Sequence, residues 1–144
     1  MGVYLVADRA FSTYPAEEVV RRYLAEVLCL VQSSNVFTVL GHLDYPLRAW
    51  PAPAGPVDLH AFEEEFRAVL TALAASGRAL EVNTRLPASP MLLRWWRDCG
   101  GQALSFGSDA HDPVQVACDF AAAAVVAGAA GFRASSGEDF WIRG

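Results

Sequence analysis

The sequence has few cysteines and none of the glycine-rich motifs that hold nucleotide phosphates. Its three cysteines, Cys29, Cys99 and Cys118, lie far apart and form no CxxC pair. An odd, unclustered set argues against a disulfide framework and favours reduced thiols in a cytoplasmic protein. Neither a GxGxxG fingerprint nor a P-loop is present, and a Ser-His-Asp triad could be assembled only by choosing freely among loop serines.

The sequence also lacks a long apolar run and a basic patch. Its most apolar window, from Phe120 to Gly131, is well short of the roughly 20 residues that span a bilayer. Asp8 and Arg9 interrupt the apolar start of the chain, so no export signal is expected. The formal net charge is -5, and the 11 Lys and Arg residues are spread along the chain. We therefore expect no membrane span and no nucleic-acid partner.

The composition is that of a globular protein with a sizeable core. The chain has 144 residues, of which 53% are hydrophobic and 19% charged, so we expect one domain over residues 1–144. The initiator Met leads directly into a segment, up to Tyr14, that shows little helical or strand pattern. This suggests a longer parent protein whose front part is missing from the sequence.

Helical and strand patterns alternate along the chain. Apolar stripes at helical spacing, and short apolar runs rich in β-branched residues, are separated by turn residues. The expected helices cover 15–32, 59–75, 90–99 and 113–127, and the expected strands cover 36–40, 79–83, 102–106 and 131–133. No hairpin pattern interrupts them, so we predict an α/β fold of parallel strands alternating with helices, as part of a barrel or of an open sheet.

The segment from Ser105 to Asp112 combines a carboxylate and an imidazole in a turn after a strand. Asp112-Pro113 is typical of a helix start, with Asp as the N-cap and Pro in the first turn. In parallel α/β folds, ligands gather at the carboxyl ends of strands, which places Asp109 and His111 at the mouth of a site. Asp and Ser are also ordinary turn residues, so a purely structural turn is the alternative.

Similar polar side chains follow the other predicted strands. The recurring pairs are His42 with Asp44, Glu81 with Asn83, and Asp109 with His111. Glu81 and Asn83 lie in a strand expected to be buried, where an unpartnered polar group costs a few kcal/mol, so both must be bound to something. Imidazole and carboxylate together are typical ligands of Zn, Mn or Fe sites with open positions for water. This pattern indicates a hydrolytic metal site, whereas His60 is expected at the surface or in a helix cap.

Three motifs resemble the last motifs of the polymerase and histidinol phosphatase (PHP) superfamily, in order and spacing. They are Val39-Leu40-Gly41-His42-Leu43-Asp44, Leu80-Glu81-Val82-Asn83-Thr84 and Phe106-Gly107-Ser108-Asp109-Ala110-His111. The histidinol-phosphatase branch is the most similar, and the resemblance runs from about Pro15 to Arg133. It implies the C-terminal part of a distorted (β/α)7 TIM-like barrel that hydrolyses phosphate monoesters with a trinuclear metal cluster.

The resemblance also implies roles for individual residues. His42, Asp109 and His111 would be ligands of a divalent metal, while Asp44, Glu81 and Asn83 would line or support the site. Arg48 and Arg85 would hold the phosphate of a small substrate such as L-histidinol phosphate through charge-assisted hydrogen bonds.

The family's opening His-x-His motif has no counterpart in the sequence, in which the remaining histidine is His60. Most ligands of a trinuclear cluster are therefore absent, and a single metal is the most that three ligands could hold. The alternative is a non-catalytic fragment or pseudoenzyme that acts as an interaction module, pairing its exposed sheet edge with a partner or with another copy.

Overall fold

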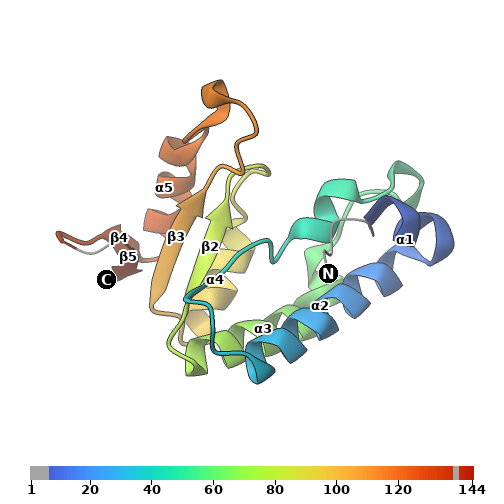
Figure 1. Cartoon of the computed structure of the whole chain (residues 1–144), viewed down its shortest axis with the longest axis horizontal. Coiled ribbons are helices and arrows are strands. Elements are labelled where there is room, and N and C mark those ends of the chain that lie inside the picture. The colour runs from blue at the N-terminus through green and yellow to red at the C-terminus, as the bar shows by residue number, and fades with distance from the viewer. Residues whose placement is uncertain (1–6, 138–139) are drawn as a thin grey trace.

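A five-stranded sheet organises the computed structural model, which describes residues 7–137 and 140–144 (Figure 1). The strand order is β1-β2-β3-β5-β4. β1 (Val39–Leu40), β2 (Ala79–Asn83) and β3 (Ala103–Gly107) run parallel to one another. β5 (Trp141–Arg143) pairs antiparallel with both β3 and β4 (Phe132–Ala134). The predicted α/β class is confirmed, with a sheet that is parallel over its first three strands.

The helices form where apolar residues recur at helical spacing. They are α1 (Ala7–Thr13), α2 (Ala16–Ser33), α3 (Glu63–Ala75), α4 (Pro90–Asp98) and α5 (Phe120–Ala129). α2 and α3 lie side by side along one flank of the molecule, and their apolar stripes face each other (Figure 1). Leu24 of α2 and Leu70 of α3 are almost fully buried in this core. Burial of each such side chain contributes about 1.5–3 kcal/mol to folding.

The two faces of the sheet differ in polarity because side chains alternate along each strand. Leu80 of β2 is paired with Leu104 of β3, and both are buried in the hydrophobic core. The next pair, Glu81 with Ser105, points to the opposite face and is less buried. The alternation therefore places Glu81 outside the apolar core, on the face of the sheet that carries the polar groups.

Three side chains cap the starts of helical segments, among them the predicted cap Asp112. The Ser89 hydroxyl accepts a hydrogen bond from the Leu92 amide, at the start of α4. The Asp58 carboxylate caps a 3-10 turn (Leu59–Phe62) that leads into α3. Asp112 accepts a hydrogen bond from the Val114 amide in the same way. Because these caps satisfy backbone donors locally, they can be predicted from short segments of sequence.

Several expected elements are different in the structure. Asp112 begins only a short 3-10 turn (Pro113–Gln115), and α5 starts later, at Phe120, so the helix expected over 113–127 is wrong in its first part. Ala117 and Asp119 have left-handed backbones, with φ of 59° and 60°, which no continuous helix allows. β1 is shorter than the strand expected over 36–40. After β1 the chain forms a proline-rich loop, which contains Pro46, Pro51, Pro53 and Pro56. Two 3-10 turns (Tyr45–Ala49 and Ala52–Ala54) interrupt this loop.

The two ends of the chain also depart from the expectation. The sequence predicts a last short strand over 131–133, and the lack of a hairpin pattern indicates parallel pairing. Instead, β4 and β5 form an antiparallel hairpin. At the other end, α1 occupies part of the segment expected to be irregular, whose residues 1–6 lie outside the described ones.

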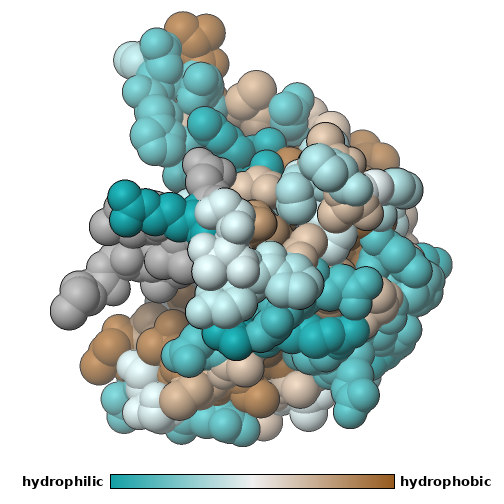
Figure 2. Space-filling model, turned by 90° about the vertical axis from the view of Figure 1, so that its right-hand side faces the viewer, coloured by the Kyte–Doolittle hydropathy of each residue, from teal (hydrophilic) through white to brown (hydrophobic). Residues whose placement is uncertain are grey.

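The surface seen in Figure 2 is the end of the molecule that carries α1 and the beginning of α2. Hydrophilic residues are frequent there, and strongly hydrophobic ones are confined to separate spots. Within the described residues, no helix is both long enough and apolar enough to cross a membrane.

Candidate metal and phosphate site

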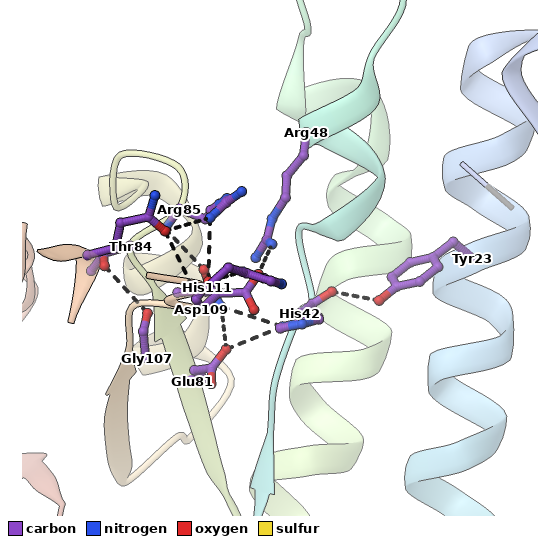
Figure 3. A network of polar contacts seen from close by, with 11 residues as sticks. Tyr23, His42, Arg48, Glu81, Thr84, Arg85, Gly107, Asp109 and His111 are labelled. Carbon is purple, nitrogen blue, oxygen red and sulfur yellow. Dashed lines mark hydrogen bonds and ion pairs between the residues drawn. The ribbon is translucent and has the colours of Figure 1, made fainter. Parts of the chain in front are cut away.

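A network of polar side chains lies at the carboxyl ends of β1, β2 and β3 (Figure 3). His42 follows β1, Glu81 and Asn83 belong to β2, and Asp109 and His111 follow β3. Parallel pairing in register brings these segments to the same edge, with Asn83 opposite Gly107. The structure therefore places the three polar pairs named from the sequence next to one another.

Glu81 and Asn83 are partnered, as burial in a strand requires. The Asn83 side-chain amide donates to Glu81 Oε1 at 2.9 Å and also lies 3.5 Å from His42 Nδ1. Its oxygen accepts the backbone N–H of Arg85 at 3.0 Å. Glu81 Oε1 in turn lies 3.5 Å from His42 Nδ1. One connected network thus joins the end of β2 to the imidazole that follows β1.

His42 is held in an unusual backbone conformation. Its φ is 60°, in the left-handed region that few side chains favour. The Tyr23 hydroxyl of α2 donates to the His42 carbonyl at 2.6 Å, and the Tyr45 backbone N–H donates to the same oxygen at 3.0 Å. The Tyr45 ring also stacks on the imidazole, with 5.8 Å between ring centroids. Sequence reasoning missed Tyr23, whose only distinguishing feature was a hydroxyl within the apolar stripe of α2.

Asp109 is paired with Arg48 across the site (Figure 3). Arg48 Nη1 donates to Asp109 Oδ2 at 2.8 Å. Partial burial raises the pKa of the Asp109 carboxyl, but the hydrogen bond from Arg48 and the charges of His42 and Arg48 outweigh this effect, so the pKa is below its usual value. Nearby, burial raises the pKa of Asp44 in spite of the Arg48 charge.

Arg48 has more hydrogen-bond donors than partners. Its Nε and Nη2 atoms are buried, and among the described residues neither has a hydrogen-bond acceptor. Its guanidinium lies over the Tyr45 ring, with 5.5 Å between the Cζ atom and the ring centroid. Leaving a buried donor unpaired costs about 1–3 kcal/mol, and more for a charged group. The Arg48 side chain is therefore suited to receive an anion.

His111 and Arg85 contact the backbone of the same loop. His111 Nδ1 lies 2.8 Å from the Asp109 carbonyl oxygen, which can only accept, so Nδ1 carries the hydrogen. Arg85 Nη1 reaches the same carbonyl and the Gln115 side chain, each at 3.4 Å. Both side chains are exposed at the rim of the site.

The proposed metal ligands do not form an assembled metal site. Within residues 7–137 and 140–144, no three His, Cys, Asp or Glu side chains come together closely enough to hold a metal ion. His42 faces Glu81, the Asp109 carboxylate faces Arg48, and the His111 ring contacts the Asp109 backbone. The donor types suit Zn, Mn or Fe, but their arrangement does not, because the cation beside Asp109 is an arginine.

Known proteins similar to this chain are phosphatases. The sequence is 33% identical over 102 residues to the histidinol-phosphatase of Lactococcus lactis subsp. lactis, covering 66% of this chain and 38% of that protein. It is 30% identical over 105 residues to the probable histidinol-phosphatase of Thermotoga maritima, covering 68% of this chain and 42% of that protein. No family model matches the sequence.

A solved structure is also similar. It is the crystal structure of histidinol phosphate phosphatase from Lactococcus lactis subsp. lactis, complexed with Zn, L-histidinol and phosphate. The TM-score is 0.69 at 29% identity, over 81% of this chain and 47% of that one.

The fold and these similarities define an α/β protein related to phosphatases. More specifically, the chain is related to the histidinol-phosphatase branch of the PHP superfamily, as its motifs predicted. It spans less than half the length of the relatives it matches.

Proposed function

We propose that this chain carries one edge of the active site of a metal-dependent phosphoesterase of the histidinol-phosphatase type. Its substrate would be a small phosphate monoester such as L-histidinol phosphate. The observation that carries the proposal is the buried Arg48 guanidinium, whose two unpartnered nitrogens lie at the strand edge occupied by His42, Glu81 and Asp109. The relationship to histidinol phosphatases supports the same conclusion.

The arginines account for phosphate binding in this proposal. Arg48 Nε and Nη2 form one side of a planar donor fork that matches two oxygens of a phosphoryl group. Arg85 adds a second positive charge from the loop after β2. Donors already in place before the reaction stabilise the negative charge that develops on the phosphoryl oxygens.

The metal ligands are proposed to be His42, Asp109 and His111. Zn is the metal in the similar crystal structure, and the ligand chemistry allows Zn, Mn or Fe. Since the Asp109 carboxylate contacts Arg48, a metal at Asp109 would have to displace that guanidinium.

The barrel architecture and the cellular compartment are part of the same proposal. The proposal of one segment of a (β/α)7 barrel is supported by the parallel strands β1, β2 and β3, with α3 and α4 between them in the sequence. The dispersed cysteines favour a cytoplasmic location.

A second candidate function is a non-catalytic interaction module. It is favoured by the lack of an assembled three-donor metal site within the described residues. The edge of β1 that does not face β2 would supply the pairing surface for a partner or a second copy.

The proposal is tested by binding and turnover measured on the same samples. Titration calorimetry should detect binding of inorganic phosphate that is lost in Arg48→Ala and retained in Arg94→Ala, which changes an exposed arginine of α4. Metal analysis after loading with Zn or Mn, and phosphate release from L-histidinol phosphate, test the metal and the chemistry. Absence of both phosphate binding and hydrolysis would refute the enzyme proposal and favour the interaction module.

A further inference from the structure

α5 is a helix without a polar side chain, and one of its sides is exposed. It lies at the opposite end of the molecule from α1 (Figure 1). Its inner side packs against the body of the protein through Ala123 and Ala127, which are buried. The exposed residues recur at helical spacing and form one side, which we call the α5 stripe. They are Ala121, Ala122, Val125, Gly128 and Ala129.

The α5 stripe differs from the exposed sides of the other long helices. α2 exposes Glu17, Arg22 and Glu26, as a surface helix of a globular protein generally does. In α5, by contrast, the residue in the middle of the exposed side is Val125, which is 73% exposed. A helix that is apolar all round is normally covered on both sides, because exposed apolar surface is unfavourable in water. The α5 stripe is therefore suited to contact another apolar surface.

Opposite charges lie at the two ends of the α5 stripe. Asp119 is exposed directly before the helix, while Arg97 and Arg133 are exposed near its C-terminal end. Arg97 Nη1 lies 3.5 Å from the Ala130 carbonyl oxygen, just after the last residue of α5. Within residues 7–137 and 140–144, none of these three side chains forms an ion pair. A second α5 that runs antiparallel would bring its own Asp119 to these arginines, and its own arginines to Asp119.

The α5 stripe is also symmetric about Val125. Ala121 and Ala129 lie at equal distances along the chain on either side of it, and so do Ala122 and Gly128. Two antiparallel copies related by a two-fold axis at Val125 therefore oppose each residue with its counterpart. The small residues around Val125 allow the two backbones to approach closely, which favours packing between helices.

We propose that the α5 stripe is the contact surface of a homodimer, in which α5 packs antiparallel against α5 of a second copy around a two-fold axis at Val125. The occupant is a second copy because the apolar stripe and the charges at its ends complement themselves in this arrangement. The inference is independent of the proposed phosphatase function.

The dimer should be weak. α5 has 10 residues. Such a contact is small beside the roughly 1,200–2,000 Å² that stable complexes bury, so we expect a dissociation constant of roughly 10 µM to 1 mM.

The first test is sedimentation equilibrium of the full chain at concentrations from about 10 µM to about 1 mM, over which the average mass should rise toward that of a dimer. Val125→Glu places two carboxylates at the axis and should weaken dimerisation at least about tenfold. Because Val125 is exposed, this variant should fold, which circular dichroism checks. Val36→Glu is the matched control, since Val36 is 90% exposed near the start of β1, and it should dimerise like wild type.

The charges at the ends of the stripe provide a second set of variants. Asp119→Asn removes the charge and keeps a residue type that tolerates the left-handed backbone, where φ is 60°. It should weaken the dimer by about two- to tenfold, because two symmetric contacts are lost. Arg133→Glu should weaken it further by replacing attraction with repulsion.

Cross-linking tests the position of the two-fold axis. In a background with Cys29→Ser and Cys118→Ser, which removes the exposed cysteines, Val125→Cys should form an intermolecular disulfide under mild oxidation. Val36→Cys in the same background should form far less.

A monomer throughout the concentration range, or a dimer that Val125→Glu leaves intact, would overturn the proposal. Loss of the dimer in Val36→Glu but not in Val125→Glu would place the contact near β1 and overturn it as well. Failure of Val125→Cys to cross-link would overturn the two-fold arrangement.

Discussion

Arg48 and Asp109 form an ion pair that connects the loop after β1 to the loop after β3, over a sequence separation of 61 residues. Their side chains are only 14% and 25% exposed, so solvent screens this pair less than it would a surface pair. This contact joins the two ends of the candidate site.

The Arg48–Asp109 pair should contribute measurably to stability. We expect Arg48→Met to lower the free energy of unfolding by about 1.5–3 kcal/mol, because Asp109 loses a charge-assisted hydrogen bond. Asp109→Asn should lower it as well, and the double variant should lose less than the sum of the two. Urea unfolding of the four proteins gives the coupling free energy, expected at about 0.5–3 kcal/mol. Additive losses would show that the two side chains are not energetically coupled.

The pH dependence of stability should reveal the partly buried Asp44. Because burial raises its pKa, the folded protein holds the Asp44 proton more tightly than the unfolded chain does. Ionisation of Asp44 therefore reduces stability as the pH rises from the unfolded pKa through the raised folded pKa. Asp44→Asn cannot ionise, so its melting temperature relative to wild type should increase over this interval and then level off. A relative melting temperature that falls as the pH rises would contradict the prediction.

Gly101 should not tolerate a side chain. A Cβ atom there would lie 2.1 Å from two ring atoms of Trp96, which is completely buried and donates through Nε1 to the Ala103 carbonyl. Since the large ring cannot move away cheaply, Gly101→Ala should reduce the free energy of unfolding by about 1–3 kcal/mol or more. Gly128→Ala is the matched control, because it lies inside α5 with open space around it and should be neutral or stabilising. Thermal and urea unfolding of both variants would check this, and equal stabilities would contradict it.

The cap of α4 should also be measurable. Ser89→Ala removes the acceptor for the Leu92 amide, so the free energy of unfolding should fall by about 1 kcal/mol. Ser89→Asp keeps an acceptor at the N-terminus of the helix and should retain most of the wild-type stability. Urea unfolding distinguishes the two variants, and equal losses would show that the hydroxyl does not act as a cap.

Elements with local determinants were predictable from the sequence, while those that depend on distant contacts were not. Ser89-Pro90 marks the start of α4 because the cap is satisfied within one turn. By contrast, Asp112-Pro113 has the same local features, yet α5 begins later. The Thr84 hydroxyl donates to the Cys118 carbonyl at 2.7 Å, which ties the intervening segment to the end of β2. No residue pattern near Asp112 indicates that contact.

The hairpin at the end of the chain also depends on a contact that is distant in the sequence. β4 and β5 have three residues each, too few for a recognisable alternation of polar and apolar residues. β5 is stabilised by pairing with β3, where Trp141 lies opposite Leu104. Its orientation is therefore determined by a strand far away in the sequence.

The candidate site was predictable in position but not in its contacts. Parallel strands with polar residues at their ends are sufficient to place His42, Glu81 and Asp109 at one edge. The pairing of Asp109 with Arg48 depends on the path of the proline-rich loop, and the hydrogen bond from Tyr23 depends on how α2 packs. Such contacts are set by packing, so sequence spacing does not reveal them.

The antiparallel strand β5 also decides where the sheet can be extended. β3 is paired with β2 on one side, and on the other side β5 occupies the edge of its first two residues, Ala103 and Leu104. Among the described strands, β1 therefore offers the outer edge of the parallel part of the sheet that no other strand shares. β1 leads directly into Gly41 and His42, so any segment that pairs there, from this chain or another, would bring its own side chains to the candidate site.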